Sequence, residues 1–291
     1  MYILFTISLL LVQLITTSAN EYCGLCLPTG PPYEDTYLVT RLWSIQSSSW
    51  SDLDVIEEFN KGFAPIVTNM PGFIQYTAAQ NNYNSSTVYF SSVFKSQEYA
   101  QNAQKAAQEF VTAGALKDVI VPLYFTESKV AFDIAADECV DTSHSGMYLN
   151  TRLYKVISVN NELTPDALRN DTAPLASAFA KQQGFVNYVG TITEDKKYLF
   201  FSNVFDDLSS SQTANGLGVS SANNTDEGDS TLLAATEGKI IFDYICTTEG
   251  GANVNSTLVP SSPASTSSAN TRRTLPVYLM SVLVAISTLI H

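Results

Sequence analysis

The stretch "YLVTRLW" (37–43) decides the fold, because nearly the same stretch, "YLNTRLY" (148–154), returns 111 positions further along the chain. Both stretches have the length and the branched and aromatic content of a β-strand. Other stretches recur in the same order, such as "KVAFD" (129–133) and "KIIFD" (239–243). Self-similarity at a period of about 110 residues is too long for a solenoid repeat and indicates a duplicated domain.

The two copies predict the same order of secondary-structure elements. In the first copy we expect strands at 37–44, 73–78, 87–94 and 129–134, with helices from Ser51 and over 96–111. In the second copy the matching strands begin at Tyr148 and lie at 185–191, 198–205 and 239–246, and a helix opens at Thr164 and Pro165. The order β-α-β-β-α-β is the ferredoxin-like arrangement. We therefore predict an α+β fold in which two ferredoxin-like repeats pair into one pseudo-two-fold α/β barrel.

The helices are predicted from apolar residues at helical spacing. In the first helix these are Leu53, Ile56, Phe59, Phe63 and Ile66, and in the second Tyr99, Ala103, Ala106 and Phe110. The second helix of the second copy contains Gly216 and Gly218, which have low helix propensity. We expect that helix to be frayed and to contain a loop.

The string "GFIQY…VYFSSVFKSQEYAQNAQKAAQEFV" (72–111) resembles the antibiotic-biosynthesis monooxygenase-type superfamily of dimeric α+β barrels. The resemblance extends over both copies, residues 37–246, and its motifs indicate fold more than chemistry. It implies a barrel that two chains usually build together, sheet against sheet. A duplicated chain would build that barrel alone, so we expect a monomer with an internal pseudo-dimer. A sheet with helices on one face also needs a cover for its other face.

Side chains alternate between the two faces of a strand. Leu38 and Leu42 lie on one face of the first strand, and we expect this face to meet the helices. The opposite face carries the arginine and the aromatic residues and is expected to line the barrel interior or its mouth. The resulting pocket candidates are Arg41, Trp43, Tyr76, Arg152, Tyr154 and Tyr188.

A second interpretation of the two arginines is structural. Asp133 and Asp243 lie at matching places in the closing strands, so Arg41–Asp133 and Arg152–Asp243 ion pairs would satisfy buried charges. The alternative is that the guanidinium groups bind an anionic or carbonyl-bearing ligand.

Several kinds of chemistry are disfavoured by what the chain lacks. Its two histidines are His144, in the stretch between the copies, and His291, the last residue. Neither lies on a predicted strand, so we expect no haem ligand and no histidine-based catalysis. Phosphate-loop, dinucleotide and zinc motifs are also absent from the sequence, so no cofactor and no metal are expected. A net charge of −13 argues against a nucleic-acid partner.

The two ends of the chain predict an address at the cell surface. Residues 1–19 have the short apolar core and the small-residue exit of a secretory signal peptide, and a membrane anchor is the alternative. The apolar run 275–290 follows a stretch rich in small residues, which is typical of a glycosylphosphatidylinositol (GPI) attachment signal. Ser265 and Ser267 are the candidate attachment sites. A C-terminal transmembrane helix is the alternative.

Secretion would also expose the chain to glycosylation and oxidation. The Asn-X-Ser/Thr sequons are at Asn84, Asn170, Asn223 and Asn255. The four cysteines are Cys23, Cys26, Cys139 and Cys246. We favour two disulfides, one from each N-terminal cysteine to the end of one copy, although four cysteines allow three connectivities. A Cys-X-X-Cys redox pair is disfavoured because the prolines that follow prevent a helix from starting there.

These predictions divide the chain into seven segments. They are the signal peptide (1–19), a cysteine-containing segment (20–36), repeat 1 (37–139), a linker (140–147), repeat 2 (148–246), a Ser/Thr-rich stalk (247–274) and the apolar tail (275–291). The favoured function is a secreted, GPI-anchored surface protein whose barrel binds a small ligand or a partner. The alternative, which the resemblance implies, is a cofactor-independent monooxygenase-like enzyme that acts on a small aromatic or quinol substrate.

Overall fold

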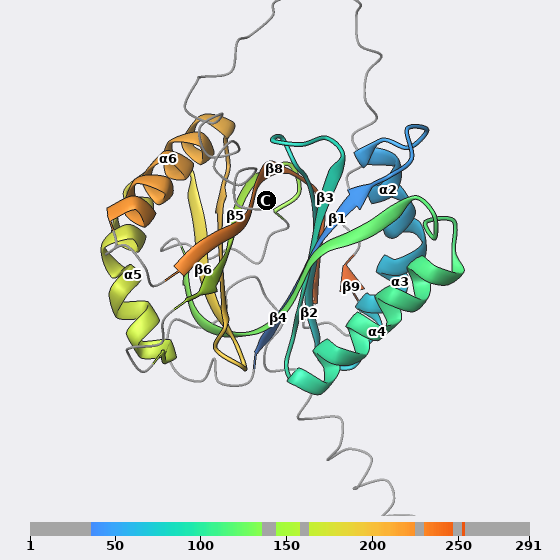
Figure 1. Ribbon diagram of the computed structural model, residues 1–291, viewed down its shortest axis with the longest axis horizontal. Helices are drawn as coiled ribbons and strands as arrows, with labels where there is room; N and C mark the ends of the chain where they lie inside the picture. The colour runs from blue at the N-terminus through green and yellow to red at the C-terminus, as the bar shows by residue number, and fades with distance from the viewer. Residues whose placement is uncertain (1–35, 136–143, 158–162, 225–229, 247–251, 254–291) are drawn as a thin grey trace, which may run out of the picture. The chain divides into compact units, whose positions relative to one another are not determined.

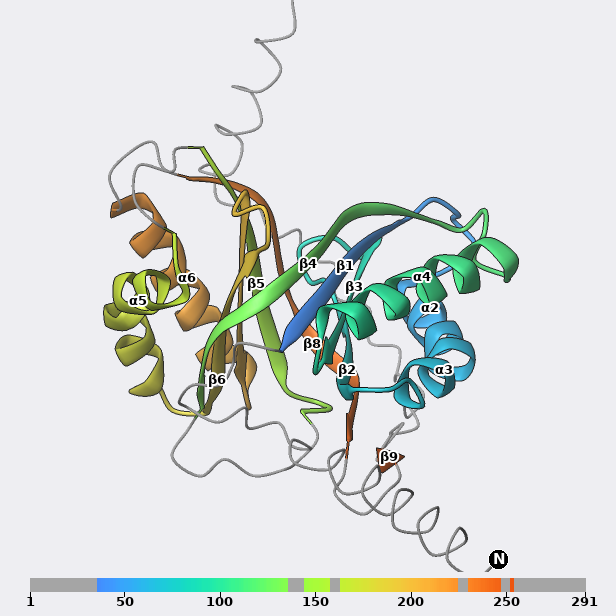
Figure 2. The same cartoon turned by 90° about the horizontal axis from the view of Figure 1, so that it is seen from below.

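The computed structural model describes residues 36–135, 144–157, 163–224, 230–246 and 252–253. In these residues the chain forms an α+β structure with a closed antiparallel barrel at its centre (Figure 1). Helices lie on two sides of the barrel, α2 to α4 on one side and α5 and α6 on the other (Figures 1 and 2). None of the helices in the described part combines the length and apolarity that a membrane span requires.

Eight strands make up the barrel. Their bounds are β1 Tyr37–Ile45, β2 Phe73–Gln80, β3 Thr87–Phe94, β4 Ile120–Ala135, β5 Tyr148–Val156, β6 Phe185–Thr193, β7 Tyr198–Phe205 and β8 Ser230–Cys246. Neighbours follow the order β2-β3-β1-β4-β6-β7-β5-β8, and β8 pairs with β2 to close the ring. A two-residue strand, β9 (Ala252–Asn253), pairs with the end of β8. Six of the predicted strands are confirmed at nearly their predicted bounds. The two closing strands, predicted at 129–134 and 239–246, each begin nine residues earlier than expected.

The long strands β4 and β8 join the two parts of the sheet. The first part of β4 pairs with β1, and its last part pairs with β6. In the same way β8 pairs first with β5 and then with β2, where Asp243 lies opposite Thr77. Because each long strand leaves its own group of strands for the other group, the barrel closes without a free edge at these seams.

Gly72 and Gly184 stand immediately before β2 and β6 and have φ angles of 70° and 73°. Only glycine adopts this left-handed region without strain. The carbonyl oxygens of Gly72 and Gly184 accept hydrogen bonds from the backbone N–H groups of Lys95 and Asp206 at 2.8 Å each. The glycine therefore turns the chain from the preceding helix into a strand in both places.

Four helical segments cover the outside of the barrel. The first is continuous and consists of α2 (Asp52–Glu58), the π-helical turn η2 (Phe59–Phe63) and α3 (Ala64–Thr68). The others are α4 (Gln97–Ala113), α5 (Pro165–Ala180) and α6 (Leu208–Asn224). Ser51, Ser96 and Thr164 cap three of these segments with their side-chain oxygens, as their sequence positions predict.

The helix faces differ in detail from the prediction. Ile56, Phe59 and Phe63 are buried, but Leu53 and Ile66 are 49% and 44% exposed. Val55 and Val67 are buried instead. Val67 follows the π turn, whose wider spacing changes which later residues face the sheet. In α4 the buried residues are Ala100, Ala103, Ala107 and Val111, so the small side chains rather than Tyr99 and Phe110 form its closest contact.

The expectation of a frayed helix near Gly216 and Gly218 is wrong, because α6 is continuous across both glycines. A Cβ atom at Gly218 would lie 2.5 Å from Arg152 Cζ, so the absence of a side chain lets the guanidinium group pack directly against the helix. A Cβ atom at Gly216 would meet nothing within 4 Å. Tertiary packing on the sheet therefore outweighs low helix propensity in this segment.

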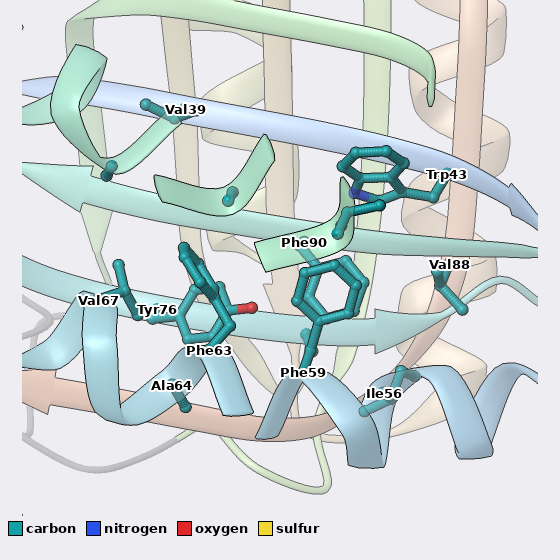
Figure 3. Close-up of a cluster of buried hydrophobic side chains, with 14 of the residues drawn as sticks. Val39, Trp43, Ile56, Phe59, Phe63, Ala64, Val67, Tyr76, Val88 and Phe90 are labelled. Atoms are coloured by element: carbon teal, nitrogen blue, oxygen red, sulfur yellow. The ribbon is translucent and has the colours of Figure 1, made fainter. Parts of the chain in front are cut away.

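The predicted orientation of the strand faces is also wrong. Leu38 and Leu149 lie in a buried cluster inside the barrel with Val93 and Val204. Val39 and Trp43 pack on the helix side, among Phe59, Phe63 and Phe90 (Figure 3). Each face of these strands carries both apolar and polar residues, so period-two alternation could not tell the faces apart. The closed interior takes mostly aliphatic and small polar side chains, and most of the larger rings fill the space between sheet and helices.

Two of the four sequons have described side chains, and both are exposed. Asn84 lies in the turn between β2 and β3, and Asn170 lies on α5. Asn223 is in α6, and Asn255 lies outside the described residues, as do Cys23, Cys26, Cys139, Ser265 and Ser267. Cys246 is the last residue of β8. The disulfides, the glycans and the two terminal signals therefore remain predictions.

Candidate functional site

Arg41 lies under helix α4 and faces away from the barrel interior. Its side chain is 2% exposed, its Nε donates to Gln104 Oε1 at 2.7 Å, and its Nη1 donates to Ser92 Oγ at 3.3 Å. Burial lowers the pKa of Arg41 to about 10, against smaller opposing effects of Tyr76 and Tyr89. The guanidinium group therefore remains charged at neutral pH while it ties α4 to strand β1.

Arg152 makes the equivalent contact with helix α6. Its Nη2 donates to the backbone oxygen of Asn215 at 2.9 Å and also contacts the Asn215 side-chain oxygen. Asn215 stands 111 positions after Gln104, so an amide side chain of the second helix receives the arginine in both places. Among the described residues neither arginine forms an ion pair with an aspartate. The predicted Arg41–Asp133 and Arg152–Asp243 ion pairs are therefore not formed among the described residues, and the role of the arginines as pocket anchors stays a prediction.

The remaining predicted pocket residues belong to the packing between sheet and helices. Trp43 and Tyr76 are buried in the cluster under α2 to α4, with the Tyr76 ring centroid 5.6 Å from that of Phe63 (Figure 3). Tyr154 and Tyr188 meet at Phe201, at centroid distances of 5.9 and 6.1 Å. The structure thus brings these four residues together as two separate pairs, and neither pair lines a cavity in the barrel interior.

A cavity of about 60 Å³ lies inside the barrel, where strands from both copies meet. One part of its wall is apolar and consists of Leu38, Ile74, Val93, Leu149, Val204 and Ile240. The polar part consists of Thr77, Ser91, Asp133, His144, Asn187 and Ser202. Apolar walls with a few convergent polar groups are the usual composition of a small-molecule site. We take this cavity as the candidate functional site.

His144 is the residue of this site that the sequence prediction missed. It is 4% exposed, its backbone N–H donates to Asp243 Oδ2 at 3.0 Å, and its Nδ1 lies 3.8 Å from the same oxygen. The adjoining turn is held on β8, because Gly146 N–H donates to the carbonyl of Ile240 at 2.8 Å. The sequence offered no signal for this placement beyond one histidine between the copies, because only the folded chain brings His144 to Asp243.

Asp243 is held in a fixed orientation by the opposite strand. Its Oδ1 accepts hydrogen bonds from Gln75 Nε2 at 2.9 Å and from Thr77 Oγ1 at 2.5 Å. Burial lowers the pKa of His144, and the charge of Asp243 opposes this only in part. The imidazole is therefore neutral at pH 7 and can accept a proton, and Asp243 would then stabilise the imidazolium.

A smaller cavity of about 20 Å³ lies elsewhere in the same interior. Thr40 and Thr151 contribute to its wall, and their hydroxyl groups pair with those of Thr126 and Thr236. Tyr89 lines both cavities. Its ring stacks on Phe200 with the centroids 6.2 Å apart and the planes inclined by 5°.

No protein-family model matches the sequence, and a search of curated proteins finds no match. Solved structures do match. An anthrone oxidase-like protein aligns with a TM-score of 0.50 at 12% identity, over 72% of this chain and 92% of its own. A candidate monooxygenase of Fusobacterium nucleatum aligns at 0.48 and 10% identity, over 71% and 92%. A haem-binding protein of Thermus thermophilus aligns at 0.46 and 9% identity, over 71% and 91%.

The chain has the fold of the dimeric α+β barrel proteins. At such low identity the likeness establishes the fold alone. A haem does not fit the barrel interior, because a cavity of about 60 Å³ is far below the 300 Å³ or more that sites for larger ligands occupy. Between the sheet and helices α4 and α6, Arg41 with Gln104 and Arg152 with Asn215 occupy the space next to the strands.

Proposed function

We propose that the chain is a small-molecule enzyme of the monooxygenase-like kind, which acts without a bound cofactor on a small hydroxylated aromatic compound inside the barrel. The observation that carries the proposal is the neutral, buried His144 beside the fixed carboxylate of Asp243, at the polar end of an otherwise apolar cavity. The likeness to an anthrone oxidase-like protein supports the same class of substrate.

In this proposal each part of the cavity wall has its own role. The apolar wall holds the ring of the substrate and excludes water. His144 takes the proton of the acidic hydroxyl group, and Asp243 stabilises the imidazolium that forms. Loss of the proton makes the ring electron-rich, so a ring carbon that bears hydrogen can form a bond to dissolved O₂, which is the oxidant. The resulting hydroperoxide loses one water molecule to leave a quinone, so one oxygen atom enters the product and the other leaves as water. Asn187 and Ser202 on the same wall are placed to orient polar groups of the substrate.

Oxygen uptake by the purified protein tests this proposal. We expect uptake with one or more members of a series of quinols and hydroxylated single-ring aromatics. The His144→Gln variant should lose about 10²- to 10⁴-fold in rate, the usual contribution of a general base. Gln108→Ala, an exposed change on α4, is the matched control and should keep full activity. If no compound of the series caused oxygen uptake, or if His144→Gln kept full activity, the proposal would be contradicted.

A second candidate is ligand binding at the cell surface without turnover. The signal peptide and GPI signal predicted at the chain ends support this address, as does the exposure of Asn84 and Asn170. Expression in a eukaryotic secretory cell, followed by phospholipase C and glycosidase treatment, tests it. Release from the membrane and a mass shift that Asn84→Gln and Asn170→Gln reduce are the expected results. Retention of the protein in the cytosol would contradict the proposed localisation at the cell surface.

We further propose that the two copies are ferredoxin-like repeats that arose by duplication and pair within one monomer. The equivalent registers support this, since Arg41 faces Phe90 in the sheet as Arg152 faces Phe201. Residues 36–143 and 144–246, made as separate chains, should then bind each other in a 1:1 complex. Two separate chains that each form only homodimers or aggregates would argue against the pairing. The intact protein should elute as a monomer.

A further inference from the structure

Two chambers lie in the barrel interior. Tyr89 borders both of them, and Phe200, on which its ring stacks, borders the smaller one. Tyr89 comes from β3 and Phe200 from β7, and the two positions are 111 residues apart, the spacing of the two copies. The rings therefore occupy equivalent places and meet inside the barrel, with nearly parallel planes. The larger chamber holds His144 and Asp133 on its wall, and the smaller one is enclosed by threonine and leucine side chains.

The chamber volumes show why this pair controls access. An apolar cavity that accepts a single benzene ring measures about 150 Å³. The two chambers measure about 60 and 20 Å³, so neither alone accepts an aromatic ring. A ring can reach His144 only if the chambers gain volume, and the side chain that borders both of them is Tyr89.

We propose that Tyr89 and Phe200 are the residues that determine substrate size, and that an aromatic ligand binds by displacing one ring of this pair and stacking on the other. The catalytic part of this inference rests on the proposed function, but the binding part does not. The site would take a single planar ring with a hydroxyl group directed toward His144.

The packing around the pair favours this role over displacement of another wall residue. Tyr89 borders empty space on two sides, so a change of its rotamer sacrifices few dispersion contacts. The aliphatic residues Leu38, Val93, Leu149 and Val204 belong to the same buried cluster as the pair, but each of them borders only the larger chamber. An aromatic ligand that stacks on the remaining ring also recovers the offset-stacked contact that the displaced ring gives up.

Binding of indole and phenol to single-site variants tests the proposal without any need for turnover. Phe200→Ala should bind both compounds at least tenfold more tightly than the wild type, as measured by the shift in thermal midpoint with ligand concentration. A crystal structure with indole should place its ring against Tyr89. Phe200→Tyr, which keeps a ring in place, is the control and should bind as the wild type does.

A second variant tests whether any change in binding comes only from a loss of stability. Phe179→Ala removes an equally buried ring from the helix side of the sheet and should lower stability without changing the size of ring that the barrel accepts. With active protein, Phe200→Ala should extend turnover to two-ring substrates, whereas Phe179→Ala should not.

The outcomes separate this inference from the proposed function. If Phe200→Ala binds indole no better than the wild type, or if indole binds outside the barrel, the pair does not determine ligand size. If indole binds against Tyr89 as expected but no variant oxidises any substrate, the size-determining pair is upheld and the enzymatic function is overturned.

Discussion

Arg41 and Arg152 show how one recurrent, buried residue type can join a helix to a sheet. Each lies on the first strand of its copy and donates to an amide residue of the helix above it, Gln104 or Asn215. Arginine suits this contact because its fixed fork of donors can meet both a side chain and a strand residue. The repeated arginine therefore serves to seat a helix on the sheet.

Removal of the Gln104 amide group should show how much the Arg41–Gln104 hydrogen bond contributes to stability. Gln104→Ala leaves the buried guanidinium group without its 2.7 Å acceptor, so we expect a loss of about 1.5–3 kcal/mol in the free energy of unfolding. Gln108→Ala, on the exposed face of the same helix, should change it by less than about 0.5 kcal/mol. Urea denaturation of both variants measures the difference, and equal values would show that the arginine does not hold α4.

His144 should make stability depend on pH below neutrality. Burial lowers its pKa in the folded state, so the unfolded chain, with a pKa near 6.5, binds the proton more readily. Its contribution to stability is therefore complete above the unfolded pKa and declines as the pH falls through 6.5 toward the folded pKa. Denaturation at pH 7.5 and 5.5 should show a drop for the wild type that is smaller in His144→Gln. An identical drop in both would mean that other groups cause it.

Helix α6 illustrates how an element can depend on its neighbours more than on its own residues. Its glycines and polar residues give it little intrinsic tendency to form a helix. It nevertheless runs from Leu208 to Asn224, because Ala214 packs into the core and Arg152 hydrogen-bonds Asn215. In α2 to α3 the reverse holds, since a capping box at Ser51 and Asp54 begins a helix that also carries a strong apolar face.

The two glycines of α6 should respond in opposite ways to the same substitution. Gly216→Ala meets open space and should raise the free energy of unfolding by about 0.5–1 kcal/mol, the propensity gain of alanine. Gly218→Ala would place its Cβ atom 2.5 Å from Arg152 Cζ, so it should be destabilising despite the same gain. Thermal unfolding of the two variants checks this. If both substitutions changed the free energy of unfolding in the same direction, the close approach of Arg152 to Gly218 would be refuted.

At the level of the whole molecule, the barrel depends on β4 and β8, which each cross from one group of strands to the other. Asp243 stands at one of these crossings. It links β8 to Gln75 and Thr77 of β2 and to the backbone of His144, so the same carboxylate closes the barrel and positions the candidate base.

Asp243→Ala should therefore affect fold and site together. Three donors lose their acceptor, and each buried donor left unsatisfied costs about 1–3 kcal/mol, so we expect a loss of several kcal/mol in stability. Asp243→Asn keeps an acceptor oxygen and should recover much of the stability without the charge that would stabilise a protonated His144. Chemical denaturation and oxygen uptake of the two variants separate these effects; if Asp243→Asn restored activity in full, the carboxylate charge would have no role.

The sequence by itself determined the strands, the capped helices, their order and the recurrence at 111 residues, because these features depend on local periodicity, capping and turn chemistry. It also predicted that a second sheet would cover the first. The tertiary structure decided which face of β1 and β5 points inward, because each face carries both apolar and polar residues and only the closed barrel distinguishes them. It also decided the site, since His144, Asp243, Tyr89 and Phe200 are far apart in the chain and only barrel closure brings His144 to Asp243 and Tyr89 to Phe200.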